Sequence, residues 1–169
     1  MKDIDITWQE ESDHSAGESS LTQWQQFSSY GTLCFHTEEP TENTPVMLAW
    51  LADNEDSLYK LICEHIGSVY QELLEDSECM DVFEDEDIYQ TKVGDFTQAE
   101  MLAGDLQKLM QISTIVMHNP ASNAVGFIFE CAWDEEHGVG IVIKDGKVLQ
   151  CDGAQEAYYD IDFILKHGV

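Results

Sequence analysis

The residues with the clearest chemical potential form one short run, Trp133-Asp134-Glu135-Glu136-His137-Gly138. Its adjacent carboxylates and its imidazole could bind a metal ion or act as general acid and base. The spacing argues against this chemistry. The H-E-x-x-H motif places two histidines one helical turn apart, whereas this run lies between two predicted strands, where consecutive side chains rarely point the same way. A metal-binding protein or metal-dependent enzyme centred on Glu135, Glu136 and His137 therefore remains the alternative hypothesis.

The favoured interpretation of the same run is a tight turn between two strands. Asp134 accepts local backbone hydrogen bonds, Gly138 supplies a positive φ, and Trp133 anchors the turn to the core. We therefore predict a structural motif made of Trp133, Asp134, Glu136, His137 and Gly138.

A second cluster lies in residues 75–87, where eight of thirteen positions are acidic. An EF-hand loop needs glycine at its sixth position, but the two possible starts place Asp81 or Glu86 there, so the calcium pattern fails. A protein-binding face is more convincing, because apolar anchors stand within an electrostatic field that attracts a basic partner. The predicted partner-binding residues are Glu75, Asp76, Glu78, Met80, Asp81, Phe83, Glu84, Asp85, Glu86 and Asp87.

Nucleophilic catalysis has little support in the sequence. It has no G-x-S-x-G motif and no glycine-rich phosphate loop, and no cysteine stands beside an obvious base. We therefore predict a protein that is not an enzyme and that uses neither a cofactor nor a metal.

The charge balance narrows the class of partner. Thirty-four acidic residues stand against seven lysines and no arginine, for a formal net charge of −27. Nucleic acid and anionic membranes are poor partners, because phosphate binding needs clustered basic residues. Most of the excess negative charge lies in residues 1–105, which have a net charge of −22, whereas residues 106–169 have a net charge of −5. This distribution favours a specialised acidic face that binds a basic protein.

The cysteines and the N-terminus indicate the compartment. The five cysteines are scattered and form no C-x-x-C pair, which favours a reducing environment. The N-terminal residues contain no apolar signal-peptide region, and the longest apolar run, residues 46–52, is too short to cross a bilayer. The sequence therefore predicts a cytoplasmic protein.

The first two-thirds of the chain must supply the helices. We expect residues 1–30 to be an irregular N-terminal extension with an edge strand near Ile4–Trp8, and residues 31–169 to be a single domain. The β-type runs 32–38 and 45–52, separated by a proline-containing turn, predict a hairpin. A helix follows, capped by Asp53 or Asn54, with an apolar stripe at Leu58, Leu61, Ile62, Ile66, Val69, Leu73 and Leu74 and with His65 packed on it.

A second helix and a β-meander complete the predicted fold. Thr97 and Glu100 form a capping box before an apolar face of Met101, Leu102, Leu106 and Leu109. Strands are expected at 111–118, 124–133, 139–143 and 147–151, the last two joined by an Asp145-Gly146 turn. The fold class is thus α+β: an antiparallel sheet of about five strands, in the order β-β-α-α-β-β-β, with both helices on one face.

Residues 124–153 resemble a family of small acidic bacterial domains with the pattern F-x-F-x-C-x-W-D-x-E-H-G-[LV]-G. Here the pattern runs from Phe127 through Cys131, Trp133, Asp134, Glu136 and His137 to Gly140. The likeness extends over most of residues 32–157, so the first thirty residues and the tail beyond Ala157 are expected to be particular to this protein. The family is functionally uncharacterised, and its resemblance to immunity-type proteins implies no catalytic residues.

Together these features predict an immunity-type protein that binds and neutralises a basic bacterial toxin, such as a nuclease, whose positive active site a carboxylate-rich surface can occupy. The metal-binding reading is the main rival. A housekeeping domain with an unknown ligand is the third hypothesis.

Overall fold

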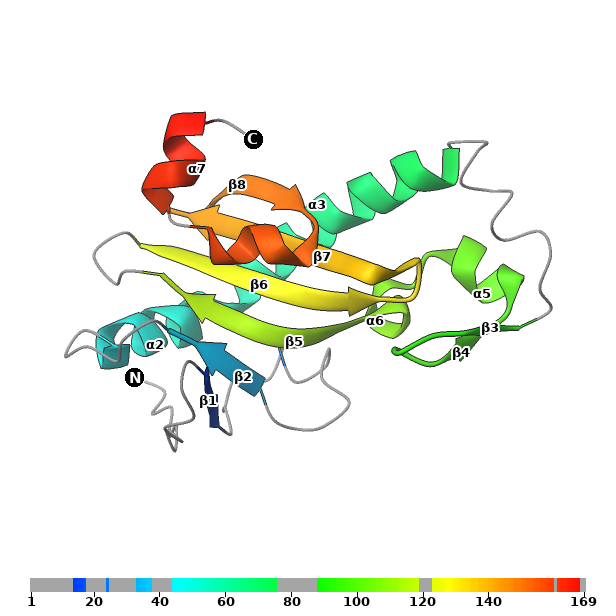
Figure 1. Cartoon of the computed structure of the whole chain (residues 1–169), viewed down its shortest axis with the longest axis horizontal. Helices are drawn as coiled ribbons and strands as arrows, with labels where there is room; N and C mark the ends of the chain where they lie inside the picture. Colours follow the sequence, from blue (N-terminus) through cyan, green and yellow to red (C-terminus); the bar gives the residue numbers. More distant parts are fainter. Residues whose placement is uncertain are drawn as a thin grey trace.

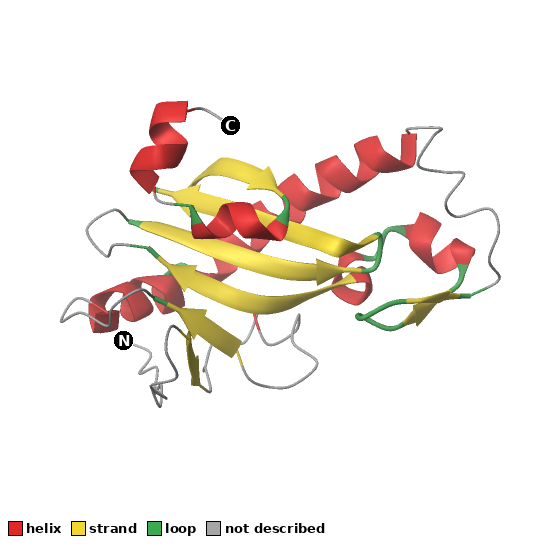
Figure 2. Ribbon diagram, in the orientation of Figure 1, coloured by secondary structure: helices red, strands yellow, loops and turns green. Residues whose placement is uncertain are grey.

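The computed structural model describes residues 14–17, 24, 33–37, 44–75, 88–118, 123–159 and 161–167. Within them the fold is α+β, as predicted, with one large mixed sheet and one small hairpin (Figures 1 and 2). The large sheet contains β1 (His14–Gly17), β2 (Leu33–His36), β5 (Met110–Met117), β6 (Ala124–Cys131), β7 (Asp134–Lys144) and β8 (Lys147–Asp152), and the hairpin contains β3 (Tyr89–Gln90) and β4 (Asp95–Phe96). The helices are α2 (Thr44–Asp53), α3 (Glu55–Glu75), α5 (Gln98–Ala103), α6 (Leu106–Leu109), the 3-10 helix η3 (Ala154–Tyr158) and α7 (Ile161–His167).

The large sheet has the strand order β1-β2-β5-β6-β7-β8. Strands β5 to β8 form the predicted antiparallel meander. At the tip of the last hairpin, Asp145 and Gly146 both have positive φ, 49° and 73°, which the Asp-Gly pair predicts. The prediction of a wholly antiparallel sheet is wrong at β2, which pairs in parallel with β5. A parallel pair needs a long crossover, and the helical region between β2 and β5 provides it.

Residues 45–52 form helix α2, so the predicted hairpin with residues 32–38 is wrong. The buried apolar side chains are Met47, Leu48, Leu51 and Ala52, a spacing that fits a helix and not a strand. Pro45 stands in the first turn, where a helix needs no N–H from it. A short apolar run is compatible with a strand or with a helix by pattern alone, so the pattern of residues 45–52 did not distinguish them.

Helix α3 follows α2 after one residue, Asn54. Its backbone N–H and its side-chain amide both donate to the Trp50 carbonyl oxygen, at 3.0 and 2.8 Å. The Asn54 side chain therefore satisfies the end of α2, whereas the sequence suggested a cap for α3. The predicted stripe is buried at Leu58, Ile62 and Ile66, but Val69 is exposed and Tyr70 is buried in its place.

The second predicted helix is divided into α5 and α6. Its capping box is confirmed, because the Glu100 N–H donates to Thr97 Oγ1 and the Thr97 N–H donates to the Glu100 carboxylate. Gly104 then ends α5 with a left-handed φ of 66°. Met101 and Leu109 are buried, whereas Leu102 is exposed.

The two faces of the large sheet are covered differently. The α3 face, under α2 and α3, carries the large side chains Phe35, Ile115, Val125, Phe127, Phe129, Ile141 and Ile143. The η3 face, under η3 and α7, carries the smaller set Val116, Ala124, Ile128 and Val142 (Figure 1). The predicted alternation along residues 124–133 is confirmed at Val125, Phe127, Phe129 and Cys131, but the sheet has helical cover on both faces.

The N-terminal part of the chain contributes to this core. Strand β1 pairs with β2 at the edge of the sheet, and the expected edge strand near Ile4–Trp8 lies outside the described residues. Trp24 is fully buried, and its ring stacks on Phe127 with centroids 4.6 Å apart.

Candidate functional site

The Trp133–Gly138 run forms the end of a tight turn and then a large bulge at the start of β7. Cys131 pairs with Asp134, and Phe129 pairs with Val139, so four residues, 135–138, stand opposite the single residue Glu130. The tight turn is therefore one step earlier than predicted, at positions 132 and 133. The polar residues belong to the bulged strand and not to a loop between strands.

Gly138 makes the return from the bulge possible. Its φ is 60°, in agreement with the predicted positive value. A Cβ atom at this position would lie 2.5 Å from the carbonyl oxygen of Phe129, a backbone atom that cannot move away without breaking the pairing. Glycine is required here both by its conformation and by the space available.

Asp134 and His137 are joined across the bulge. The His137 N–H donates to Asp134 Oδ1 at 2.9 Å, and His137 Nδ1 lies 3.1 Å from the same oxygen. Both side chains are solvent-accessible, at 67 % for His137 and 37 % for Asp134. The carboxylate therefore fixes a backbone amide of its own bulge, which is the local role that the sequence predicts for an aspartate at such a turn.

Glu135 ties the bulge to the β3–β4 hairpin. Its Oε1 accepts a hydrogen bond from the Lys92 N–H at 2.6 Å, and its carbonyl oxygen accepts one from Lys92 Nζ at 2.9 Å. Sequence reasoning missed this contact, because the two residues are 43 positions apart and carry no shared local pattern.

Trp133 connects the bulge to the helices. Its ring packs on Tyr70 of α3, with centroids 4.5 Å apart, and the Tyr70 hydroxyl donates to the Met101 carbonyl oxygen of α5 at 2.7 Å. Burial raises the pKa of Tyr70 to about 12. Trp133 is partly buried in a second apolar cluster formed by Tyr70, Tyr89, Phe96, Met101, Leu109 and Ala132.

Gly140, two residues after Gly138, allows the backbone of η3 to approach the sheet closely. A Cβ atom there would lie 2.7 Å from the carbonyl oxygen of Gly153 and 3.0 Å from that of Ala154. On the neighbouring strand, a Cβ at Gly126 would lie 2.8 Å from the carbonyl oxygen of Ala157. The backbone of η3 therefore rests directly on two glycines of the η3 face.

The polar groups of this region mainly stabilise the local backbone. Two of its carboxylates, Asp134 and Glu135, accept hydrogen bonds from backbone amides, and Glu136 is exposed. Across the described part of the chain, no group of three or more histidine, cysteine or acidic residues is arranged to hold a metal ion. The thiols nearby are poor nucleophiles, because burial raises the pKa of Cys131 and raises that of Cys151 to about 11.

The second apolar cluster brings several acidic elements to one end of the molecule. The end of α3, the β3–β4 hairpin, α5 and the bulge all contribute residues to this cluster (Figure 1). We call this region the acidic end and define it by its exposed acidic residues Glu72, Glu75, Asp95, Glu100, Glu135 and Glu136. Three exposed apolar side chains stand on the same elements or beside them, namely Val69, Ile88 and Leu102.

The predicted partner-binding segment begins at this end. Glu75 is the exposed last residue of α3, and the described chain resumes at Ile88, just before β3. The other predicted residues lie outside the described part of the chain: Asp76, Glu78, Met80, Asp81, Phe83, Glu84, Asp85, Glu86 and Asp87.

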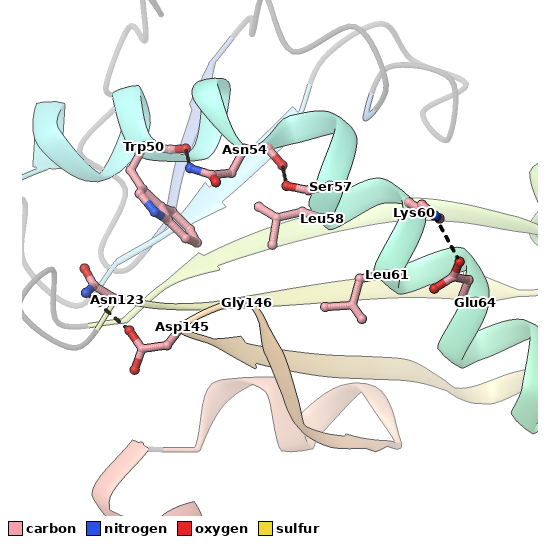
Figure 3. Close-up of a pocket in the computed structure, with 10 residues that line it drawn as sticks. All are labelled: Trp50, Asn54, Ser57, Leu58, Lys60, Leu61, Glu64, Asn123, Asp145 and Gly146. Carbon is pink, nitrogen blue, oxygen red and sulfur yellow. Dashed lines mark hydrogen bonds and ion pairs between the residues drawn. The ribbon is translucent and has the colours of Figure 1, made fainter.

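A pocket of about 470 Å³ lies far along α3 from the acidic end. It is bounded by the α2–α3 junction, by Asn123 before β6 and by the β7–β8 turn (Figure 3). Sequence reasoning did not find this pocket, because its walls come from three separate parts of the chain. Among the described helices, none is long and apolar enough to cross a membrane.

The fold and the bulge define the class: an α+β domain whose mixed sheet carries a glycine-dependent bulge and is covered on both faces. The chain belongs to the family described as Domain of unknown function (DUF6985), whose model matches residues 8–159. The expectation that the first thirty residues are particular to this protein is therefore wrong from residue 8 onward. The match ends before α7. Neither the curated proteins nor the solved structures gave a significant match.

Proposed function

We propose that this chain is an immunity-type protein that binds and neutralises a basic bacterial toxin through its acidic end. A nuclease fits best among toxins, because its active site presents positive potential to phosphates and a carboxylate-rich surface can occupy that potential. The chain itself needs no catalytic group for this task.

The observation that carries the proposal is the excess of acidic residues that no cation within the chain can balance. Seven lysines face 34 acidic residues. Within the described part of the chain, three lysines contact a carboxylate, in the pairs Lys60–Glu64, Lys108–Asp105 and Lys144–Asp145. Concentrated negative charge opposes folding by self-repulsion, so its retention is best explained by a positively charged partner.

The acidic end adds the features of a protein-binding surface. Ile88 and Leu102 are 54 % and 42 % exposed, and the exposed Glu100 lies two residues before Leu102 in α5. Apolar anchors within a charged rim are typical of interface hot spots, whereas a bare acidic surface gives attraction without a stable complex. The predicted apolar anchors Met80 and Phe83 belong to the segment that follows Glu75 in the sequence.

The rival hypothesis, a metal site at Glu135, Glu136 and His137, has less support. Glu135 is engaged by Lys92, and the side chain of His137 faces Asp134. Stoichiometric metal in the purified protein, lost on substitution of His137, would reverse this ranking.

The test is the kinetics of binding to the product of the adjacent gene, with cytochrome c as a non-cognate basic control. We expect association to be fast and to slow as salt rises, because exposed charges are screened beyond about 8 Å at physiological ionic strength. Association that is independent of salt, or binding no tighter than that of cytochrome c, would contradict the proposal.

Variants distinguish residues that speed association from residues that slow dissociation. Phe83→Ala should leave association unchanged and speed dissociation, whereas neutralising Glu84, Asp85, Glu86 and Asp87 together should mainly slow association. Glu72→Gln with Glu75→Gln should also slow association, and the same charge change at Asp152 and Asp162, on β8 and α7, is the control. Wild-type kinetics for all these variants would place the interface elsewhere.

A further inference from the structure

The pocket of about 470 Å³ combines an aromatic ring, an apolar wall and a carboxylate. In Figure 3 the Trp50 side chain extends from α2 towards the β7–β8 turn, where Asp145 and Asn123 lie beneath it. Leu58 and Leu61 extend from α3 towards the same space. The pocket stands apart from the bulge and from the acidic end.

The apolar wall is firmly supported. Leu58 is 2 % exposed and belongs to the main core, and Trp50 and Leu61 are partly buried against that core. The indole is therefore held by packing against the core and also lines the pocket. A ring fixed in this way can stack a flat group without first losing side-chain freedom.

The Asp145 carboxylate is positioned by hydrogen bonds between Asp145 and Asn123, which both have an unusual backbone conformation. Asp145 and Asn123 both have left-handed backbones, with φ of 49° and 50°. The Asp145 N–H donates to the Asn123 carbonyl oxygen at 3.1 Å, and the Asn123 amide lies 3.3 Å from Asp145 Oδ1. Two adjacent loops thus fix each other, and the Asp145 carboxylate is positioned before any ligand arrives.

The cations already near the pocket are weak competitors. Lys144 Nζ lies 3.5 Å from Asp145 Oδ2, and Lys60 Nζ lies 3.6 Å from Glu64 Oε1 at the rim. Both contacts are longer than a strong charged hydrogen bond, and Lys60 and Glu64 are largely exposed. Such pairs contribute little, and a planar cation that forms two hydrogen bonds to one carboxylate can replace them.

We propose that this pocket receives an arginine side chain of the basic partner, with the guanidinium stacked on Trp50 and paired with Asp145. The proposal rests on the proposed function, which requires a basic partner. Arginine fits because its guanidinium both stacks on an indole and pairs with a carboxylate through two N–H groups. Its aliphatic stem would lie along the partly buried Leu61. The carboxylates of Asp145 and Glu64 at the pocket favour a cationic occupant over an anionic one.

The first experiment uses a short blocked peptide, acetyl-Gly-Arg-Gly-amide, added to the ¹⁵N-labelled protein. We expect saturable shifts of the Trp50 indole N–H and of the Asp145 amide in NMR spectra. A matched peptide in which citrulline replaces arginine keeps the size and loses the charge, and it should bind at least about tenfold more weakly. Equal binding of the two peptides, or shifts confined to residues outside the pocket, would overturn the proposal.

Variants complete the test with the full partner. Trp50→Leu and Asp145→Asn should each weaken binding of the adjacent gene's product about tenfold or more, whereas Asp152→Asn, with the same charge change outside the pocket, should stay near wild type. If Trp50→Leu does not fold, Asp145→Asn against Asp152→Asn still decides the question. Wild-type affinity in both pocket variants would refute the pocket alone. Absence of specific binding by the wild-type chain would refute the proposed function.

Discussion

The two faces of the large sheet are packed by opposite means. On the α3 face, large side chains such as Phe127 and Phe129 fill the space beneath the helices. On the η3 face, Gly126 and Gly140 let the backbone of η3 approach until its carbonyl oxygens nearly touch the strands. The α3 face is stabilised by the large side chains that it buries. The η3 face depends on the absence of side chains at its two glycines. The same kind of substitution should therefore have different effects on the two faces.

The largest effect is expected from removing a ring on the α3 face. Phe129 is fully buried, so Phe129→Ala removes its transfer free energy and leaves a cavity. We expect a loss of about 3–5 kcal/mol in the free energy of unfolding, measured by urea denaturation. A loss below about 1 kcal/mol would mean that this face is not packed as described.

The η3 face should respond to added volume. Gly140→Ala places a methyl group against the carbonyl oxygens of Gly153 and Ala154, and this overpacking should destabilise by about 1–3 kcal/mol. The contrasting variant is Gly67→Ala in α3, where the nearest atom is Leu106 Cδ1 at an ordinary 3.5 Å. Alanine should stabilise that helix by up to about 1 kcal/mol. Calorimetric melting temperatures that move the same way in both variants would break the comparison.

The buried thiols should give the α3 face a sensitivity to alkali. Burial holds the pKa of Cys151 at about 11, above its ordinary value of 9.0, and raises that of Cys131 as well. A raised pKa means that the folded state keeps the proton more tightly, so this stability is complete below about pH 9 and is lost as pH rises through about 11. Cys131→Ala with Cys151→Ala should flatten the decline of unfolding free energy between pH 9 and 11. An unchanged slope would assign the decline to other groups, such as Tyr70.

The smallest effect is expected at the bulge. His137→Ala keeps the backbone N–H that donates to Asp134 and removes only an exposed ring contact. The unfolding free energy should fall by roughly 0.5–1 kcal/mol, while binding of the basic partner remains. A variant that keeps full stability and loses bound metal or an activity would instead favour the metal hypothesis.

The sequence predicted those parts of the fold in which a local pattern has one physical meaning. The alternation from Val125 to Cys131 identifies a strand with one core face, and the Thr97–Glu100 pair identifies a helix start. The prediction of a strand at residues 45–52 was wrong, because a short apolar run fits a strand or a helix until its burial is known. Helical cover on the second face also went unpredicted, because the glycines that receive η3 look like ordinary strand glycines in sequence.

The candidate sites were less predictable for the same reason. Asp134 accepts a hydrogen bond from the backbone N–H of His137, three residues further on, and the sequence predicted such a local backbone bond without naming its donor. The contacts of Glu135 with Lys92 and of Trp133 with Tyr70 join distant elements, and no local spacing reports them. The pocket walls at Trp50, Leu58 and Asp145 have the same origin. Partner binding by the acidic segment 75–87 stays a prediction.

The parallel pair of β2 and β5 has a consequence for the order of folding. Cys34 pairs with Thr114, whereas the pairs of the meander join strands that follow one another directly in the chain. Closing a large loop is entropically unfavourable until the contacts within it have formed, and such distant pairings slow folding. We therefore expect β5 to β8 to assemble first and to provide a template on which β2, and with it β1, docks last. In pulsed hydrogen exchange, amides of β6 should gain protection before those of β2.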